Sequence, residues 1–283
     1  MSEADTSTEG ASQPDQGPAS TKEGGSVWVP APRLMELLYS EGTSFIDHKG
    51  QSREAVGTGI IPIVGSARSG KTALAYSLIE WVIENTNRPI ALLGLPDKTL
   101  ESIPEAWRDR VSNPEVEKMV EFKRPAVCLL DDTAVILNSR ESGTNFAKYL
   151  SRIAGVISHI GGGLTLILTT QSMSGIDLSL TRYTNLASVV RMVDRWTLRT
   201  ERTSWVDDIS HAQNELEAVS RMKYLRDVYY SLHDDLICYA TFPQFYDDVL
   251  SRPYQYMSKD MRRRIILRAK DQKKKGGSED EQP

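Results

Sequence analysis

The chain has 283 residues and a formal net charge of −4 at pH 7, with 40% hydrophobic and 25% charged residues. This composition is that of an ordinary globular protein, and the acidic balance excludes a polycation that coats nucleic acid over its whole surface. Its two cysteines, Cys128 and Cys238, are too few for a disulfide framework and lack metal-ligand spacing.

Residues 1–25 consist of small, polar and acidic residues with almost no large apolar side chain. Such a segment cannot bury enough surface to offset its ordering entropy, so we expect it to be disordered. The N-terminus lacks the apolar region of a secretory signal, and no apolar run reaches the roughly 20 residues of a membrane span. We therefore expect a protein of the cytoplasm or of the interior of a particle.

Short β-rich runs then alternate with helical or polar segments. The runs are Ile60–Val64, Pro89–Leu95, Ala126–Leu130, Leu164–Thr170, Ala187–Met192 and, more weakly, Leu236–Thr241. Nearly continuous apolar strands separated by helices predict an α/β fold whose mostly parallel sheet is covered on both faces.

Three helices are predicted from apolar residues that recur at spacings of three and four. The first follows the first strand and carries Leu74, Leu78 and Val82 on one stripe. The second covers residues 145–160. The third runs from about Asp208 to Leu232, and its predicted apolar face comprises Ile209, Ala212, Leu216, Val219, Met222 and Leu225.

Between the first strand and the first helix lies "GSARSGKT", which matches the phosphate-loop pattern G-x-x-x-x-G-K-[ST]. In such a loop, backbone N–H groups converge on phosphate oxygens at the positive end of a helix. Lys71 is expected to reach the β- and γ-phosphates, and the Thr72 hydroxyl to ligate Mg²⁺. The predicted nucleotide contacts are Gly65, Ser66, Ala67, Arg68, Ser69, Gly70, Lys71 and Thr72.

The strand "AVCLL" ends in Asp131 and Asp132. An acidic residue at the end of a buried strand near the phosphate loop holds Mg²⁺, and a second acidic residue can orient the attacking water. We assign the metal role (Walker B) to Asp131 and the base role to Asp132.

The strand "LTLILTT" ends in a polar residue, Gln171. Open α/β sheets bind ligands at the carboxyl edge of their strands. The Gln171 amide is therefore expected to sense the γ-phosphate.

In this order, "GSARSGKT", "VCLLDD" and "GGGLTLILTTQSMSGID" resemble the FtsK–HerA superfamily of P-loop ATPases. Within it, the likeness is greatest to viral genome-packaging ATPases and related Zot-like proteins. The resemblance spans roughly residues 55–245 and implies a RecA-like core and a homo-oligomeric ring that hydrolyses ATP to move double-stranded DNA. It also implies attachment to a capsid vertex or to virion membrane proteins, and a virion-associated or cytoplasmic location.

A ring motor of this kind needs an arginine, donated across the subunit interface, to stabilise charge on the transferring phosphoryl group. Arg140 and Arg152 are the candidates, with Arg182 as a third; for any one of them, a solvated surface arginine is the more common alternative. Gln171 would pass the state of the γ-phosphate to a DNA-facing loop, "SMSGIDLSLTRYTN".

Two basic clusters are candidates for DNA contact, since phosphate contacts need little more than lysine and arginine. The first comprises Arg191, Arg195, Arg199 and Arg202, interleaved with Trp196 and Trp205. The second is the run Arg262–Lys275, which could also attach to a capsid or lipid face, or remain a solvated end.

The chain is accordingly divided into a disordered tail (1–25), an ATPase domain (26–245) and a basic C-terminal extension (246–283). The main prediction is an ATP-hydrolysing DNA translocase that packages a viral genome. Two alternatives stay open: a non-motor P-loop enzyme such as a nucleotide or small-molecule kinase, and a protein that binds ATP to stabilise an assembly.

Overall fold

A computed structural model describes residues 28–114, 126–131, 163–176, 185–220 and 227–256. The predicted disordered tail, the helix expected at residues 145–160 and the basic run Arg262–Lys275 lie outside these ranges.

Within the described residues, eight strands form one sheet in the order β10-β9-β8-β3-β7-β6-β4-β5. The pairs from β8 to β5 are parallel, whereas β9 and β10 are antiparallel to their neighbours. The sheet strands are β3 (Gly59–Val64), β4 (Ile90–Leu92), β5 (Val111–Ser112), β6 (Ala126–Leu130), β7 (Leu164–Thr170), β8 (Val189–Val190), β9 (Val228–Ser231) and β10 (Leu236–Tyr239). The predicted α/β fold with a mostly parallel sheet is confirmed.

The central strands β3, β6 and β7 agree with the sequence prediction and are buried along their whole length. β4 and β8 are shorter than predicted. Burial on both faces explains why these strands read as continuous apolar runs.

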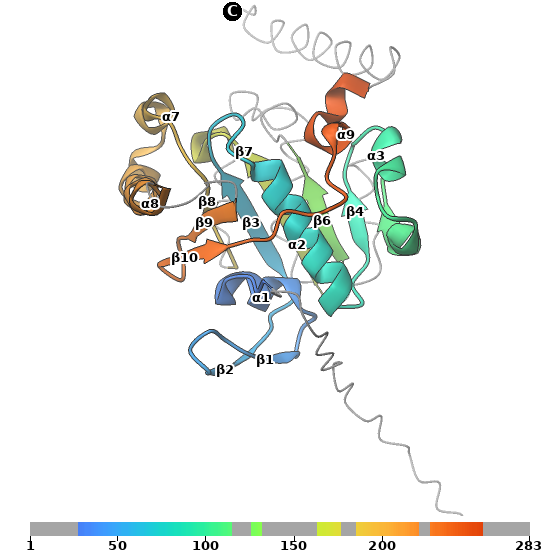
Figure 1. Cartoon of the computed structure of the whole chain (residues 1–283). Coiled ribbons are helices and arrows are strands. Elements are labelled where there is room, and N and C mark those ends of the chain that lie inside the picture. The colour runs from blue at the N-terminus through green and yellow to red at the C-terminus, as the bar shows by residue number, and fades with distance from the viewer. Residues whose placement is uncertain (1–27, 115–125, 132–162, 177–184, 221–226, 257–283) are drawn as a thin grey trace, which may run out of the picture.

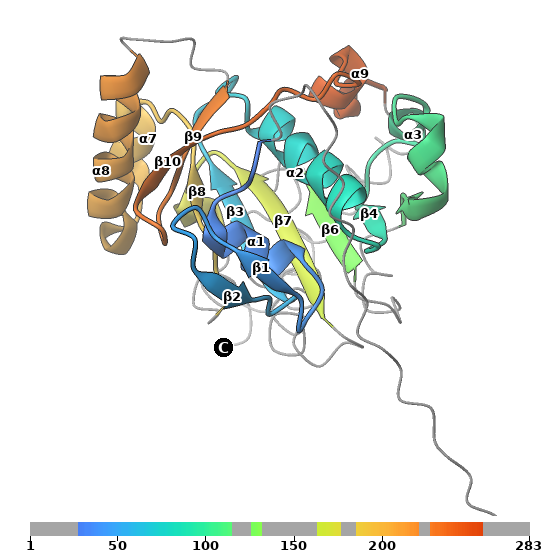
Figure 2. The same cartoon turned by 60° about the horizontal axis from the view of Figure 1, so that its bottom comes forward.

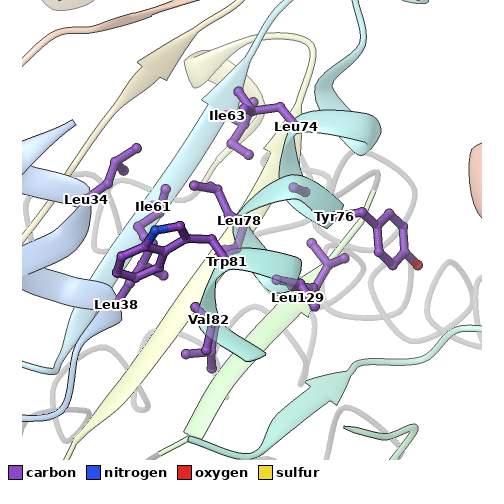
Figure 3. Packing of buried hydrophobic residues seen from close by; sticks show 14 of the residues in the cluster. Leu34, Leu38, Ile61, Ile63, Leu74, Tyr76, Leu78, Trp81, Val82 and Leu129 are labelled. Atoms are coloured by element: carbon purple, nitrogen blue, oxygen red, sulfur yellow. The ribbon is translucent and has the colours of Figure 1, made fainter. Parts of the chain in front are cut away.

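One face of the sheet is covered by α2 (Lys71–Asn85), which follows the phosphate-loop sequence as predicted. Leu74, Leu78 and Val82 point from α2 toward the sheet, where they meet Ile61 and Ile63 of β3 (Figure 3). The buried cluster extends to Leu129 of β6 and to α1 (Pro32–Leu38). This cluster fixes the start of α2, and thus the loop before it, against the sheet.

The other face is covered in part by α8 (Thr203–Ser220), which lies beside α7 (Arg195–Thr200) on the far side of the sheet from α2 (Figures 1 and 2). Ile209, Ala212 and Leu216 are buried, as the predicted apolar face requires.

The predicted helix end at Leu232 is wrong, because Val228–Ser231 is strand β9. Its valine and tyrosines suit a pleated sheet, and it pairs with both β8 and β10.

The two ends of the described chain lie at opposite ends of the sheet. α1 and the hairpin of β1 (Ser44–Ile46) and β2 (Ser52–Glu54) lie at the bottom of Figure 1. The short helix α9 (Asp248–Ser251) and the 3₁₀ helix η7 (Pro253–Tyr256) lie at the top, beside α2 and α3 (Lys98–Glu101). Two further 3₁₀ helices of the described ranges are η1 (Glu105–Arg110) and η5 (Met173–Gly175). In the part of the chain that is described, every helix is too short or too polar to cross a bilayer.

Candidate nucleotide site

The loop between β3 and α2 curls tightly at the carboxyl edge of the sheet. Gly70 caps α2 in the left-handed conformation, with φ of 86°. A side chain there would be strained, and its Cβ would lie 2.8 Å from Nη2 of Arg191. A Cβ at Gly65 would lie 2.5 Å from Ser69 Oγ and 2.9 Å from Arg191 Cβ. Both glycines of the motif are therefore required by close packing around Arg191.

Arg191 supports the loop from behind. Its side chain is 2% exposed, its Nε donates to the Ser69 carbonyl at 2.9 Å, and its Nη1 donates to the Val228 carbonyl. Burial lowers the pKa of Arg191 to about 10, so the guanidinium stays charged at neutral pH. The prediction that Arg191 belongs to a DNA-contacting cluster is wrong, because this side chain faces the loop and not solvent.

The segment after Arg191 holds the loop through Ser66. The Ser66 N–H donates to the Met192 carbonyl at 2.9 Å, and the Asp194 N–H donates to Ser66 Oγ at 2.6 Å. Asp194 also caps α7 by accepting from the Thr197 N–H at 2.7 Å. This last bond, with help from Ser66, holds the pKa of Asp194 below its usual range. The loop and the start of α7 therefore form one hydrogen-bonded unit.

Lys71 begins α2, and its ammonium folds back over the loop to donate to the Ser66 carbonyl at 2.8 Å. The side chain thus occupies the hollow enclosed by the loop. An anion placed there would meet the ammonium, the start of a helix and the loop N–H groups together.

Asp131 is 3% exposed at the end of β6 and is the centre of a small polar network. Thr72 Oγ1 donates to Asp131 Oδ1 at 3.0 Å, and Thr169 Oγ1 donates to the same oxygen at 2.5 Å. Because β7 lies between β3 and β6, Thr169 reaches Asp131 from the neighbouring strand. The two predicted metal ligands, Thr72 and Asp131, are therefore in direct contact.

The residues present fit Mg²⁺ when it is held jointly with phosphate. Mg²⁺ prefers oxygen ligands, keeps several waters and is bound through one or two protein groups plus substrate phosphates. Thr72 and Asp131 supply a hydroxyl and a carboxylate of this kind. The described residues contain no cluster of three or more histidines, cysteines and acids that would hold a metal without a nucleotide.

Two cavities adjoin the loop. The larger, about 1170 Å³, extends from the loop to Gln213 and Glu217 of α8 and to Phe242 and Tyr246. The smaller, about 310 Å³, lies on the Asp131 side and is also lined by Thr169 and Gln171. Gln171 thus lies at the carboxyl edge of the sheet, in the same cavity lining as Lys71 and Thr72, and its contact with the γ-phosphate stays a prediction.

A second wall of both cavities comes from residues after β10. Tyr246 lines the larger cavity together with Thr72 and packs on Tyr76 of α2, with ring centroids 5.9 Å apart. Burial, followed by the nearby Asp131 charge, raises the pKa of Tyr246 above its usual range. Ser251, Arg252 and Gln255 line both cavities. No motif in the sequence marks these residues, because their role depends on the folded chain bringing this segment back beside the phosphate loop.

Four of the sequence candidates, Asp132, Arg140, Arg152 and Arg182, lie outside the described residues. The roles assigned to them stay predictions. Thr169 and the loop-supporting role of Arg191 were missed: a threonine in an apolar strand and an arginine after another have no distinctive spacing.

The predicted basic cluster is only partly a surface feature. Arg202 donates to the Ser174 and Ile176 carbonyls, and Trp205 of α8 packs against the core. Arg195 and Arg199 are exposed on α7, together with Trp196, which is 72% exposed. Only Arg195, Trp196 and Arg199 of the predicted DNA-contacting cluster are therefore exposed to solvent.

No protein-family model and no curated protein matches the chain. Solved structures with a similar fold include the DNA-packaging ATPase B204 from Sulfolobus Turreted Icosahedral Virus, at 14% identity over 66% of this chain and 98% of that one, with a TM-score of 0.42.

B204 from Sulfolobus turreted icosahedral virus 2, in complex with ATP-gammaS, is 14% identical over 65% of this chain and 97% of that one, with a TM-score of 0.44. EccC (ATPases 2 and 3) from Thermomonospora curvata is 11% identical over 88% of this chain and 49% of that one, with a TM-score of 0.47. At these identities the likeness concerns the fold alone.

Proposed function

We propose that this chain binds ATP with Mg²⁺ at residues 65–72 and hydrolyses it to move double-stranded DNA, as a subunit of a homo-oligomeric ring that packages a viral genome. The observation that best supports ATP hydrolysis is the contact between Thr72 and Asp131 beside the phosphate loop. A hydroxyl from the loop and a carboxylate from a neighbouring strand end are the pair that holds Mg²⁺ in P-loop NTPases.

In this proposal each residue has a defined task. The Lys71 ammonium exchanges the Ser66 carbonyl for the β- and γ-phosphate oxygens, and the loop N–H groups bind the same phosphates. Thr72 and Asp131 hold Mg²⁺, which when bound neutralises charge on the phosphate oxygens. Thr169 keeps the Asp131 carboxylate oriented toward Thr72. Asp132 orients the attacking water, and Gln171 contacts the γ-phosphate.

Coupling to DNA is supported by the way α7 is attached at both ends to the nucleotide site. Asp194, at its start, bonds to Ser66 of the phosphate loop. Glu201, at its end, accepts from Ser172 Oγ and the Met173 N–H, each at 2.8 Å, directly after Gln171. A change at the γ-phosphate would thus act on both ends of α7, whose exposed Arg195 and Arg199 are suited to DNA phosphates.

The partners and location in the proposal follow from the motif resemblance. They are double-stranded DNA, identical subunits in a ring, capsid vertex or virion membrane proteins, and a cytoplasmic or virion-associated site. Arg140 or Arg152 would serve as the arginine donated between subunits.

The test is the rate of ATP hydrolysis with and without double-stranded DNA, measured beside the mass of the oligomer. We expect Mg²⁺-dependent turnover that DNA stimulates, and a mass of several subunits. Lys71→Ala should lower kcat by at least about 10²-fold while leaving that mass unchanged. Arg199→Ala should weaken the stimulation and lower the salt dependence of DNA binding by about one unit of slope.

Other outcomes point to the alternatives. Turnover by a monomer that DNA does not stimulate would contradict the motor and favour a kinase or another small-molecule enzyme. An oligomer that needs ATP to form but does not hydrolyse it would favour an assembly protein.

A further inference from the structure

Two exposed arginines, Arg68 and Arg252, line both cavities beside the phosphate loop. Arg68 belongs to the loop itself, whereas Arg252 follows α9, far along the chain. Both cavities are also lined by Lys71 and Thr72, so Arg252 lies at the boundary between the loop and the Asp131 side of the site.

Arg252 differs from the other cations that hold this region together. Lys71 donates to the Ser66 carbonyl and Arg191 to the Ser69 carbonyl. Within the described ranges, the Arg252 guanidinium makes no hydrogen bond and no ion pair; the hydrogen bonds of this residue are made by its backbone, whose N–H donates to the Asp248 carbonyl and whose carbonyl accepts from the Gln255 N–H. An exposed guanidinium in a cleft that also holds a phosphate loop is suited to bind phosphate oxygens, which it can contact with two parallel N–H groups.

The position of Arg252 is fixed by packing of the segment that carries it. Leu250 is fully buried, and Asp247 caps α9 by accepting from the Leu250 N–H at 2.9 Å. Asp247 also accepts from Ser102 Oγ at 2.7 Å. Phe245 packs edge-on against Trp107 and Tyr76, with ring centroids 5.1 and 6.1 Å apart. Residues 242–256 are thus anchored to α2 and α3, as the position of α9 in Figure 1 shows.

We propose that Arg252 is a catalytic residue that contacts the phosphates of the nucleotide bound to its own chain, on the Asp131 side. This proposal rests on the proposed function. In the reaction, a water oxygen forms a bond to the γ-phosphorus, the bond from that phosphorus to the β–γ bridging oxygen breaks, and ADP, phosphate and a proton result. The Arg252 guanidinium stabilises negative charge on the phosphate oxygens as the bond breaks.

The experiment compares ATP turnover, without DNA, for the full chain and for Arg252→Ala, Arg252→Lys and Lys71→Ala. We expect Arg252→Ala to lower kcat by about 10²-fold with little change in KM, and Arg252→Lys to recover part of the loss. Arg108→Ala is the matched control: Arg108 is exposed on η1 and lines neither cavity, so its loss should leave kcat unchanged. Thermal unfolding of each variant checks that the fold is retained.

Mixing two inactive variants decides whether Arg252 acts within its own chain. Arg252→Ala retains a complete phosphate loop, and Lys71→Ala retains Arg252. If Arg252 served a neighbouring subunit, mixed oligomers would regain activity; we expect no recovery. Recovery, or wild-type kcat in Arg252→Ala where Lys71→Ala is inactive, would overturn the inference and leave the proposed ATPase intact. A wild-type chain that does not hydrolyse ATP would overturn both.

Discussion

Arg88 shows at the residue scale how this fold is held together away from the nucleotide site. Its side chain is 1% exposed, and its Nη atoms donate to backbone carbonyls at the end of α1, to Gly57 and Ala126, and to Thr165 Oγ1 of β7. Burial lowers the pKa of Arg88 to about 10, which leaves it charged at neutral pH. One cation thereby joins the end of α1, Gly57 and the strands β6 and β7.

We expect Arg88→Met to lower the free energy of unfolding by about 3 kcal/mol, because several buried carbonyls would lose their donor at once. Denaturant unfolding measures the change. Arg108→Met, at an exposed position, should stay within about 0.5 kcal/mol of the wild type. An equally small effect of Arg88→Met would show that the carbonyls find other donors.

The site residues are of two kinds: some are recognised from a continuous sequence pattern, and others act through contacts with segments distant in sequence. Lys71 and Thr72 follow from the loop pattern, since loop and helix are continuous in sequence. The support that Arg191 gives the loop depends on β8 lying beside β3, which no spacing in the sequence reveals. An arginine beside a tryptophan-containing basic run suggested a nucleic-acid surface instead.

At the scale of elements, the hairpin of β1 and β2 depends on one buried carboxylate. Asp47 accepts from the Gln51 N–H at 2.9 Å, the Lys49 N–H at 2.8 Å and Arg53 Nε at 2.8 Å. The bond from Gln51, with the help of Arg53 and Lys49, lowers the pKa of Asp47 from its ordinary value of 3.8. Arg53 also bonds to Glu36 of α1, so the turn is tied to the domain.

The pKa of Asp47 in the folded state lies below that in the unfolded state, so its stabilising effect is complete above pH 3.8 and is lost as the pH falls through the lower folded value. We expect Asp47→Asn to unfold more readily than the wild type at pH 7, with a gap that narrows below pH 3.8. Melting temperatures between pH 7 and 3 provide the measurement. Glu54→Gln, exposed on β2, is the control; parallel pH curves for Asp47→Asn and the wild type would contradict the role of Asp47.

The sequence predicts an element well when a strand is buried on both faces or when the apolar residues of a helix recur at regular spacing. β3, β6 and β7 are buried on both faces, and α2 has a regular apolar stripe, so their residues indicated their structure. β9 falls within the predicted helix from Asp208 to Leu232, although its residues form a strand. Only pairing with β8 and β10 selects the extended form.

At the scale of the whole molecule, ligand binding should stabilise the fold, because the proposed site joins the sheet, α2 and the segment 242–256. ATP with Mg²⁺ at about 100 times its Kd should add about 2.7 kcal/mol, which raises Tm by about 2 to 4 °C per kcal/mol. Thermal unfolding with and without the nucleotide measures this shift. Chelation of Mg²⁺ should reduce it, and Lys71→Ala should nearly abolish it; an equal shift in Lys71→Ala would place the nucleotide elsewhere.

The sequence by itself determined the α/β class, the central strands, and the phosphate loop with its lysine and threonine, because each depends on residues that are neighbours along the chain. Tertiary structure alone decided that Thr72 meets Asp131, that Thr169 orients this carboxylate, that Arg191 supports the loop, and that residues 242–256 return to form the second wall. The physical reason is that these contacts join segments brought together only by strand order and core packing, and neither leaves a fixed spacing in the sequence.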